Sequence, residues 1–532
     1  MFKQKKKRKE ELLQSFGKPS ADEVDIDLIA AFFNKKDKSD AYHVISDKTC
    51  LDLGLDTLFQ YLDRTTSPIG KQVLYNKLRT IHSSSANKDK KEALIQKFMD
   101  DPEFRVSVQL KLNKVDHKNG YYIPSLFQDE HLEPPRWFSA IKFLSFTSVA
   151  SLILLPFNIN FLFILLALFA VNTVIHYWNK NNLYQYLGSI PQLLKLNAVA
   201  RDLYQYNDFK FIDDKVPQAL SVLNKIRNRM SFFRLESGLQ SEIQAITWGI
   251  LELFKILFLI EPLLLFDVLK LLDTRRDEIE TLFTFTGEID ALISIASLRS
   301  KPDQVCIPEI SDKSQIIAES VYHPLIEDCV VNSIDTRNKS VLLTGSNMSG
   351  KTTFIRTIGL NVITALTLNT CFAKSFITSR FAVSSAIRIS DDLLNDKSYY
   401  FEEVLTIKSM IDASVSGKSN FFLLDEIFKG TNTVERISAG KAVLSELSRN
   451  GNLVFVSTHD IELTDLLQDS YELYHFSERV EQSNVDFDYI LKRGKLTQRN
   501  AIRILEINGY PESVIKEAVT LSRNFDEIFR KS

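Results

Sequence analysis

A phosphate-loop pattern constrains the fold of this chain more than any other feature. Residues 345–352, Gly-Ser-Asn-Met-Ser-Gly-Lys-Thr, match G-x-x-x-x-G-K-[ST] and lie between the run VLLT and a helical pattern beginning at Thr353. In such a loop the backbone N–H groups wrap a phosphate, and the next helix directs its positive N-terminal end to the same anion. The pattern therefore predicts a strand, a nucleotide-binding loop and a helix within an α/β domain.

The loop residues are the predicted nucleotide ligands. This set comprises Gly345, Ser346, Asn347, Met348, Ser349, Gly350, Lys351, Thr352 and Thr353. We expect Lys351 to neutralise the β- and γ-phosphates of ATP, and the Thr352 hydroxyl to ligate Mg²⁺.

Two later runs supply acidic and basic partners for the loop. The run NFFLLD ends at Asp425, predicted to support Mg²⁺, and the next residue, Glu426, is predicted to orient and deprotonate the attacking water. The run LVFVST is followed by His459, predicted to contact the γ-phosphate or that water. Helical segments separate these runs, which is typical of a parallel sheet wound with helices.

An uncharged apolar segment precedes this domain. Residues 143–175 contain no Asp, Glu, Lys, Arg or His, and a turn at 156–160 divides them into two arms. Each arm with its flanks approaches the length of about 20 residues that a membrane span needs. Arg136, Lys142, His176 and Lys180 flank the outer ends, as expected of a membrane hairpin with both ends in the cytoplasm. The alternative is a buried helical pair in a large core.

A second apolar stretch, residues 250–272, contains Glu252, Lys255, Glu261 and Asp267. Charges at bilayer depth are costly, so we interpret it as soluble core with its charges on one exposed helix face.

Composition limits the remaining classes. A chain of 532 residues favours two or three domains, and 65 Lys and Arg against 67 Asp and Glu indicate no general affinity for nucleic acid. The basic run at residues 3–9 fits phosphate or anionic-lipid contact, or a solvated disordered tail. Four scattered cysteines argue against a disulfide framework and a zinc site and fit a reducing cytosol. The polar continuation after the basic run predicts no cleavable signal peptide.

These patterns divide the chain into five predicted parts. They are a polar, basic segment (1–46), a helical core-like domain (47–135), the apolar hairpin (136–180), a helical lever-like region (181–314) and the ATPase domain (315–532). The predicted fold is therefore multidomain, with a mainly α-helical N-terminal region and an α/β P-loop domain of the ABC-like class.

Several motifs resemble the MutS mismatch-repair family. TGSNMSGKTTFIRTIG is similar to its phosphate loop, DEIFKGTNTVERISAG to its Walker B segment, and VSTHDIELTDL to its THxxEL element. YHPLIE resembles its RHPxxE segment, and ILKRGKLTQRNAIRILEINGYPESVIKEA resembles its closing, subunit-joining helices. This match covers about two fifths of the chain. Residues 51–80, with LGL…LFQYLDRTTSPIGKQVLYNKL, are more weakly similar to the start of the family's core helical domain.

The resemblance implies a homodimer whose subunits clamp DNA under the control of ATP. The stretch from Lys397 to Val404 resembles the family's STFxxE element, which makes Ser398 the residue that reaches the other subunit's γ-phosphate. No LSGGQ-type segment of a transporter cassette occurs. The Phe-x-Glu reader and the connector domain of mismatch-finding members are not recognised either, which predicts no preference for mismatched DNA.

The motifs thus predict an Mg²⁺-dependent ATPase with Lys351, Glu426 and His459 as catalytic residues. The resemblance adds Ser398 to this set and implies DNA as the partner. The protein's domains are expected in the cytoplasm, held by the hairpin at the inner face of the cell membrane. The alternative is a membrane-anchored ABC-like ATPase that acts on a non-DNA partner or has a structural or remodelling role.

Overall fold

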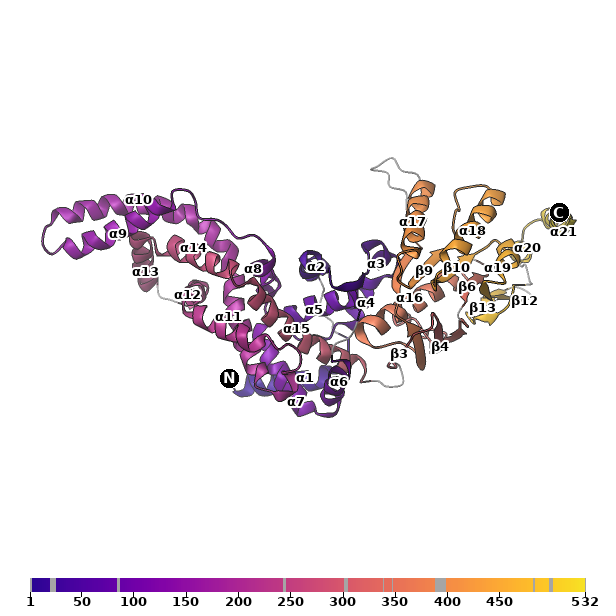
Figure 1. The fold of residues 1–532 in the computed structure, drawn as a ribbon, viewed down its shortest axis with the longest axis horizontal. Coiled ribbons are helices and arrows are strands. Elements are labelled where there is room, and N and C mark those ends of the chain that lie inside the picture. The colour runs from indigo at the N-terminus through magenta and orange to yellow at the C-terminus, as the bar shows by residue number, and fades with distance from the viewer. Residues whose placement is uncertain are drawn as a thin grey trace. The chain divides into compact units, whose positions relative to one another are not determined.

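The chain forms two compact units, drawn in Figure 1. The computed structural model describes residues 2–19, 25–83, 87–242, 245–300, 305–337, 339–346, 348–387, 399–481, 484–496 and 501–531. The helical unit comprises residues 1–37, 62–76 and 85–300. The α/β unit comprises residues 38–61, 77–84 and 301–532. The predicted five-part division of the chain stays a prediction.

The helical unit is built from helices alone within its described residues. These are α1 (Phe2–Ser15), α2 (Ile26–Lys35), α5 (Pro68–Arg79, which runs on into residues of the other unit), α6 (Lys88–Asp100), α7 (Pro102–Leu112), α8 (Ser125–Gln128), α9 (Phe138–Leu154), α10 (Asn160–Leu187), α11 (Ser189–Tyr204), α12 (Val216–Glu242), α13 (Ala245–Phe258), α14 (Ile260–Asp273) and α15 (Arg276–Leu298), with short 3-10 turns at Asn113–Val115, Lys118–Tyr122 and Asn207–Phe209. The predicted helical N-terminal region is confirmed.

Helix α15 forms the centre of this unit. Most residues from Ile279 to Leu298 are buried. Its Asp290 carboxylate accepts hydrogen bonds from Thr66 N (2.8 Å), Ser67 N (2.9 Å) and the Ser67 hydroxyl (2.6 Å). Asp290 thereby satisfies donors at the start of α5, where a helix leaves its first N–H groups unpaired. Helix α5 accordingly begins at Pro68, directly after these two residues.

The basic N-terminal run is helical in its described part. Residues Phe2–Ser15 form α1, and Arg8 donates to Asn113 Oδ1 at 2.8 Å while Lys9 pairs with Glu103 at 2.6 Å. The interpretation as a disordered tail is therefore wrong for this run, because side-chain contacts with α7 and the turn after it hold it in place.

Helices α9 and α10 form the antiparallel hairpin that the apolar segment predicted (Figure 1). Their burial is the reverse of a soluble core. Large apolar side chains lie on the outside, among them Phe146 (72% exposed), Phe157 (83%) and Val174 (71%), whereas Ser148 and Asn172 are buried. Asn172 Nδ2 donates to Leu257 O at 2.8 Å. Among the described residues, the tertiary fold therefore leaves much of the apolar surface of the hairpin uncovered.

Two described helices are long and apolar enough to span a membrane. One is the continuous helical stretch of residues 160–204, in which 17% of the most apolar 18-residue segment is buried. The other is α15, in which 83% of the most apolar 18-residue segment is buried. The length and apolar composition of a membrane span are therefore found in a core helix, α15, as well as in α10. The two helices differ in how much of their apolar surface is exposed.

The charges of α13 and α14 correct one sequence interpretation. Glu252, Lys255 and Glu261 are buried rather than on an exposed face, and only Asp267 of the four charges is solvent-facing. Glu252 pairs with His176 Nε2 at 3.0 Å and with Lys180 Nζ at 2.6 Å, while Lys255 bridges Glu252 and Glu261. Buried charges persist when they are paired, and here the partners lie partly on α10, which the local sequence pattern cannot reveal.

The α/β unit contains the following described elements. They are β1 (Ala41–Val44), α3 (Asp47–Leu53), α4 (Leu55–Leu62), β2 (Thr80–His82), β3 (Glu309–Ser311), β4 (Ile316–Val321), β5 (Asn332–Asp335), β6 (Ser340–Thr344), α16 (Lys351–Leu368), β7 (Ser375–Ser379), β8 (Ala382–Ala386), α17 (Tyr399–Ser414), β9 (Asn420–Asp425), α18 (Thr433–Leu447), β10 (Leu453–Thr458), α19 (Glu462–Leu467), β11 (Tyr471–His475), β12 (Glu478–Glu481), β13 (Asn484–Phe487), β14 (Lys492–Arg493), α20 (Ala501–Ile507) and α21 (Glu512–Lys531).

A six-stranded sheet organises this unit. Its strand order is β14-β11-β6-β10-β9-β8, and every neighbouring pair is parallel except β14 with β11. The three predicted strands are confirmed as β6, β9 and β10, and all of their residues except Asp425 at the end of β9 are buried. Strands buried on both faces are the expected form of a parallel sheet covered by helices. A smaller sheet of order β3-β7-β4-β5 lies in the same unit.

Candidate nucleotide-binding and catalytic site

Three parallel strands bring the predicted site residues to one sheet edge. Strand β10 pairs in parallel with both β6 and β9. The loop after β6, Asp425 at the end of β9 and His459 after β10 therefore share the carboxyl edge, where open α/β sheets bind ligands. Residues that are more than 100 positions apart in the sequence meet there for a topological reason.

The phosphate loop has the backbone that its glycines permit. Gly345 (φ 151°) and Gly350 (φ 103°) adopt angles that are strained for other residues, and Gly350 is the N-cap of α16. A Cβ at Gly345 would lie 2.8 Å from Phe476 O, and one at Gly350 would lie 3.3 Å from the Tyr489 ring. Side chains are thus excluded from both positions, which leaves backbone N–H groups free to approach a phosphate.

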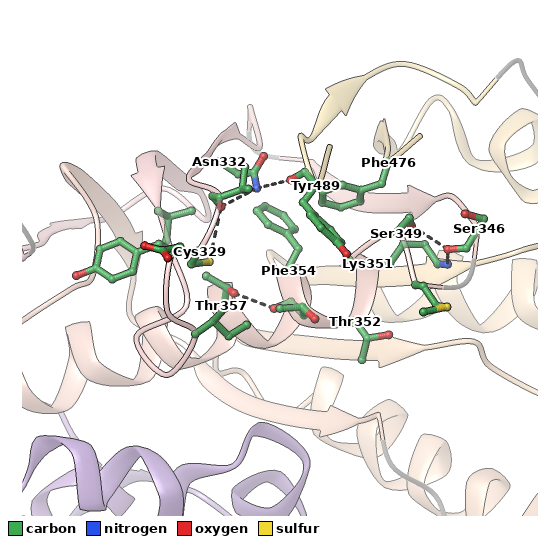
Figure 2. A pocket seen from close by; sticks show the side chains of 18 of the residues that line it. Cys329, Asn332, Ser346, Ser349, Lys351, Thr352, Phe354, Thr357, Phe476 and Tyr489 are labelled. Atoms are coloured by element: carbon green, nitrogen blue, oxygen red, sulfur yellow. Dashed lines mark hydrogen bonds between the residues drawn. The ribbon is translucent and has the colours of Figure 1, made fainter. Parts of the chain in front are cut away.

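Lys351 is buried at the start of α16. Its Nζ donates to Gly345 O at 2.8 Å and to Ser346 O at 2.9 Å, so the ammonium lies inside the curve of the loop (Figure 2). Burial lowers the pKa of Lys351, whereas the charges of Glu426 and Asp425 act in the opposite direction. Because the buried ammonium bonds to uncharged carbonyl oxygens, its positive charge can be neutralised by an anion that binds at the loop.

Oxygen atoms suited to Mg²⁺ meet beside the lysine. The Thr352 hydroxyl donates to Asp425 Oδ2 at 2.8 Å, and the Ser457 hydroxyl donates to Asp425 Oδ1. Hydroxyl and carboxylate oxygens are the ligands that Mg²⁺ uses together with phosphate oxygens and water. The residues present therefore fit the ion that the sequence pattern implies.

The Glu426 carboxylate is held by two side-chain nitrogens. His459 Nε2 lies 2.7 Å from Glu426 Oε1, and Lys429 Nζ lies 2.7 Å from Glu426 Oε2. Burial alone would raise the pKa of Glu426, but the hydrogen bonds from His459 and Lys429 outweigh it and lower the pKa to about 2. The carboxylate is thus ionised at neutral pH and oriented next to the phosphate loop.

A cavity of about 550 Å³ opens beside the loop (Figure 2). Its lining includes the loop residues Ser346 and Met348–Thr353, Glu426, and several side chains that sequence reasoning missed: Tyr322, Cys329, Asn332, Phe354, Phe476 and Tyr489. Asn332 Nδ2 donates to Tyr489 O at 3.0 Å and fixes that ring-bearing segment. The four aromatic residues come from four separate segments of the unit, so no local motif could have identified them.

Other polar partners were also missed. Glu478 accepts a hydrogen bond from the Ser346 hydroxyl at 2.8 Å, and Arg436 makes a two-pronged contact with Asp460 at 2.8 and 2.6 Å. In the sequence, the charges of these side chains were the only local feature that could have indicated their place in the site. Two predicted site residues, Asn347 and Ser398, lie outside the described residues.

The fold and this site define a phosphate-loop domain, and one family model matches it. Residues 341–526 match the family model described as MutS domain V. The chain is therefore a MutS-related protein, as the motifs in the sequence predicted.

Curated relatives support the same family. The DNA mismatch repair protein MutS of Aquifex pyrophilus is 28% identical over 260 residues, which are 47% of this chain and 30% of that protein. MutS of Geobacillus sp. (strain WCH70) is 29% identical over 257 residues, or 45% and 29% of the two chains. MutS of Clostridium botulinum (strain Langeland) is 26% identical over 288 residues, or 50% and 30%. The similarity thus spans less than a third of the length of these relatives.

Proposed function

We propose that this chain binds Mg²⁺–ATP at the loop of residues 345–352 and hydrolyses it. The observation that carries the proposal is the gathering of Lys351, Thr352, Asp425 and Glu426 at one sheet edge, next to a cavity large enough for a nucleotide. ATPase domains with a phosphate loop use this set of groups for charge neutralisation, metal binding and water activation. The ABC-like class of the domain is part of the same proposal.

Each residue has a distinct role in this proposal. The loop N–H groups, from Gly345 to Thr353, and Lys351 hold the phosphates, while Thr352 and Asp425 hold Mg²⁺. Mg²⁺ held by these two residues would neutralise negative charge on the phosphates. Glu426 orients the attacking water and accepts its proton, and His459 keeps the Glu426 carboxylate in position and contacts the γ-phosphate side. The aromatic lining near Tyr489 holds the base of the nucleotide.

Two substitutions separate nucleotide binding from chemistry. Lys351→Ala is expected to abolish productive ATP binding, because it removes ground-state charge at the phosphates. Glu426→Gln is expected to retain ATP and to hydrolyse it at least 100-fold more slowly, on the order of the contribution of a positioned general base. ATP affinity and single-turnover hydrolysis of the purified variants measure the two effects. Equal loss of binding in both variants would contradict these roles.

We also propose that two copies share their ATP sites through Ser398. Support comes from the resemblance of residues 397–404 to the family's STFxxE element and from the exposed apolar side chains Tyr510, Val514 and Leu521 near or on α21. A mixture of Ser398→Ala and Lys351→Ala subunits then contains dimers with one intact site. Hydrolysis should therefore recover above either variant alone. A fully active monomer at every concentration would rule out shared sites.

DNA is the proposed partner of the dimer, with nucleotide binding controlling how the subunits clamp it. The proposal rests on the relatives, which are named DNA mismatch repair proteins. We expect backbone contacts without base information, so duplexes with and without one G·T pair should compete equally at two salt concentrations. A preference above about tenfold, or 1.4 kcal/mol, for the mismatched duplex would contradict this expectation.

A second proposal concerns the hairpin. We propose that α9 and α10 anchor the protein in the cell membrane with both units in the cytoplasm, where the ATPase acts on DNA or, alternatively, on a non-DNA partner or in a remodelling role. Support comes from the exposed apolar side chains and from Trp137 and Trp178, whose rings lie 4.9 Å apart at the base of the hairpin. Aromatic residues at this level, flanked by Arg136, Lys142 and Lys180, are typical of a membrane interface.

Outer-face charges test the anchor without disturbing packing. The double variant Phe146→Asp, Val174→Asp changes two exposed side chains, and the matched control Leu51→Asp changes another exposed apolar residue of the α/β unit. The double variant should move the protein from the membrane to the soluble fraction, whereas the control should not, because charge is costly at bilayer depth. A wild-type protein that is monodisperse in water without detergent would refute the anchor.

A further inference from the structure

The loop that carries Glu426 has an unfavourable backbone. Glu426 (φ 54°) and Phe428 (φ 60°) are both left-handed, although neither is glycine. A bulky residue in this region is a steric outlier that persists only where its surroundings hold it. Two such residues within three positions, one of them the proposed general base, indicate that the loop of residues 426–430 depends on contacts from outside itself.

One side of the loop is held by the sheet. Glu426 N donates to Ser457 O at 2.9 Å, and Ile427 is buried in the core beneath α18. These contacts fix the start of the loop. They leave the Phe428 N–H and the turn towards Gly430 to be held from the other side.

The first turns of α17 hold that other side. The Glu403 carboxylate, on a residue only 1% exposed, accepts a hydrogen bond from Phe428 N. The rings of Tyr400 and Phe428 lie 6.3 Å apart, and a Cβ at Gly430 would lie 3.0 Å from Tyr400 Cβ. Helix α17 therefore packs directly on the loop, with a carboxylate at the residue whose backbone is strained.

Burial of a carboxylate at this position costs free energy unless the carboxylate makes a hydrogen bond that an apolar residue cannot make. Burial raises the pKa of Glu403, opposed by the Phe428 hydrogen bond and the charge of Lys429. Within the described residues, its second oxygen has no hydrogen-bond partner. If Glu403 served packing alone, a leucine at this position would make the fold more stable. An acceptor for the Phe428 N–H, by contrast, requires an oxygen atom.

We propose that Glu403 is a positioning residue for ATP hydrolysis: it fixes Phe428, and through it the loop that presents Glu426 to the attacking water. The proposal rests on the proposed role of Glu426. Glu403 is not among the described residues that line the cavity beside the phosphate loop, so it acts on the rate of chemistry rather than on nucleotide affinity. Because α17 begins one residue after Ser398, the same contact also links the loop to the segment that is proposed to reach the partner's nucleotide.

Three variants test the contact. Glu403→Leu keeps the size of the side chain but removes the acceptor, Glu403→Gln keeps an oxygen for the Phe428 N–H, and the control Asp412→Asn alters an exposed acid of the same helix that pairs only with Lys408 among its described ion pairs. We expect kcat to fall at least tenfold in the Leu variant, with the ATP dissociation constant within twofold of wild type. The Gln and control variants should keep kcat within threefold.

Two results with these variants would overturn the proposal. A Leu variant with wild-type kcat, or a Gln variant as slow as the Leu variant, would show that the hydrogen bond does not position the base. If the Leu variant does not fold, amide exchange at Phe428 in the wild-type protein gives the answer: strong protection supports the contact, and exchange as fast as in an open loop refutes it. Absence of hydrolysis in the wild type would refute the proposed ATPase instead, and the exchange measurement would still judge the contact.

Discussion

His323 gives the α/β unit a predictable sensitivity to acid. Its ring is buried next to Tyr322, which lines the cavity, and its Nδ1 accepts a hydrogen bond from Leu325 N at 3.3 Å. Burial, with a smaller contribution from Arg356, lowers the pKa of His323 from 6.5 to about 4. The folded state therefore binds the proton less tightly than the unfolded state does, and folding is favoured when the ring is neutral.

The size of the effect follows from the two pKa values. Stability from this group is complete above pH 6.5 and is lost as pH falls towards 4. At pH 5 the ratio of protonated to neutral His323 is roughly 30 to 1 in the unfolded state and about 1 to 10 in the folded state. This difference corresponds to a loss of about 2 kcal/mol in the free energy of unfolding at 25 °C. His323→Asn should remove this loss, because the Asn Oδ1 can replace Nδ1 as the acceptor for Leu325 N and does not titrate.

Amide exchange in β6, β9 and β10 is the suitable assay, since all three tryptophans of the chain, Trp137, Trp178 and Trp248, lie in the helical unit. After correction for the intrinsic pH dependence of exchange, the opening free energy of the wild type should fall between pH 8 and pH 5 by about 2 kcal/mol more than that of His323→Asn. The control His82→Asn, at a half-exposed histidine, should follow the wild type. Superimposable pH profiles for wild type and His323→Asn would refute the reasoning.

Three further outcomes are expected. Burial raises the pKa of Asp290 to about 7, so the unfolding free energy of the helical unit should fall as pH rises from 4 to 7, and urea unfolding of Asp290→Asn should show a flatter profile. Gly287→Ala should lower the thermal stability of that unit by about 1–3 kcal/mol, because a Cβ there would lie 2.3 Å from Val73 Cγ2. Arg436→Met should reduce kcat several-fold by releasing Asp460 and its neighbour His459, whereas Lys441→Met on the same helix should not.

The sequence by itself determined the elements whose signals are local. The phosphate-loop spacing predicted β6, the loop and α16, and the runs ending at Asp425 and Ser457-Thr458 predicted β9 and β10, because glycine geometry and apolar runs act over a few residues. Parallel pairing then required the ends of these strands to meet, so the placement of Lys351, Asp425 and His459 at one edge followed from the order of motifs.

Only the tertiary structure decided which side chains face one another. The pairing of Glu426 with Lys429 and His459 depends on loop conformation, and the contact of Glu403 with Phe428 joins positions that lie 25 residues apart. The burial of Glu252 follows from partners on α10 some 72 residues away. A local pattern records the polarity of a helix face, but whether that face meets water, lipid or a paired charge depends on what packs against it.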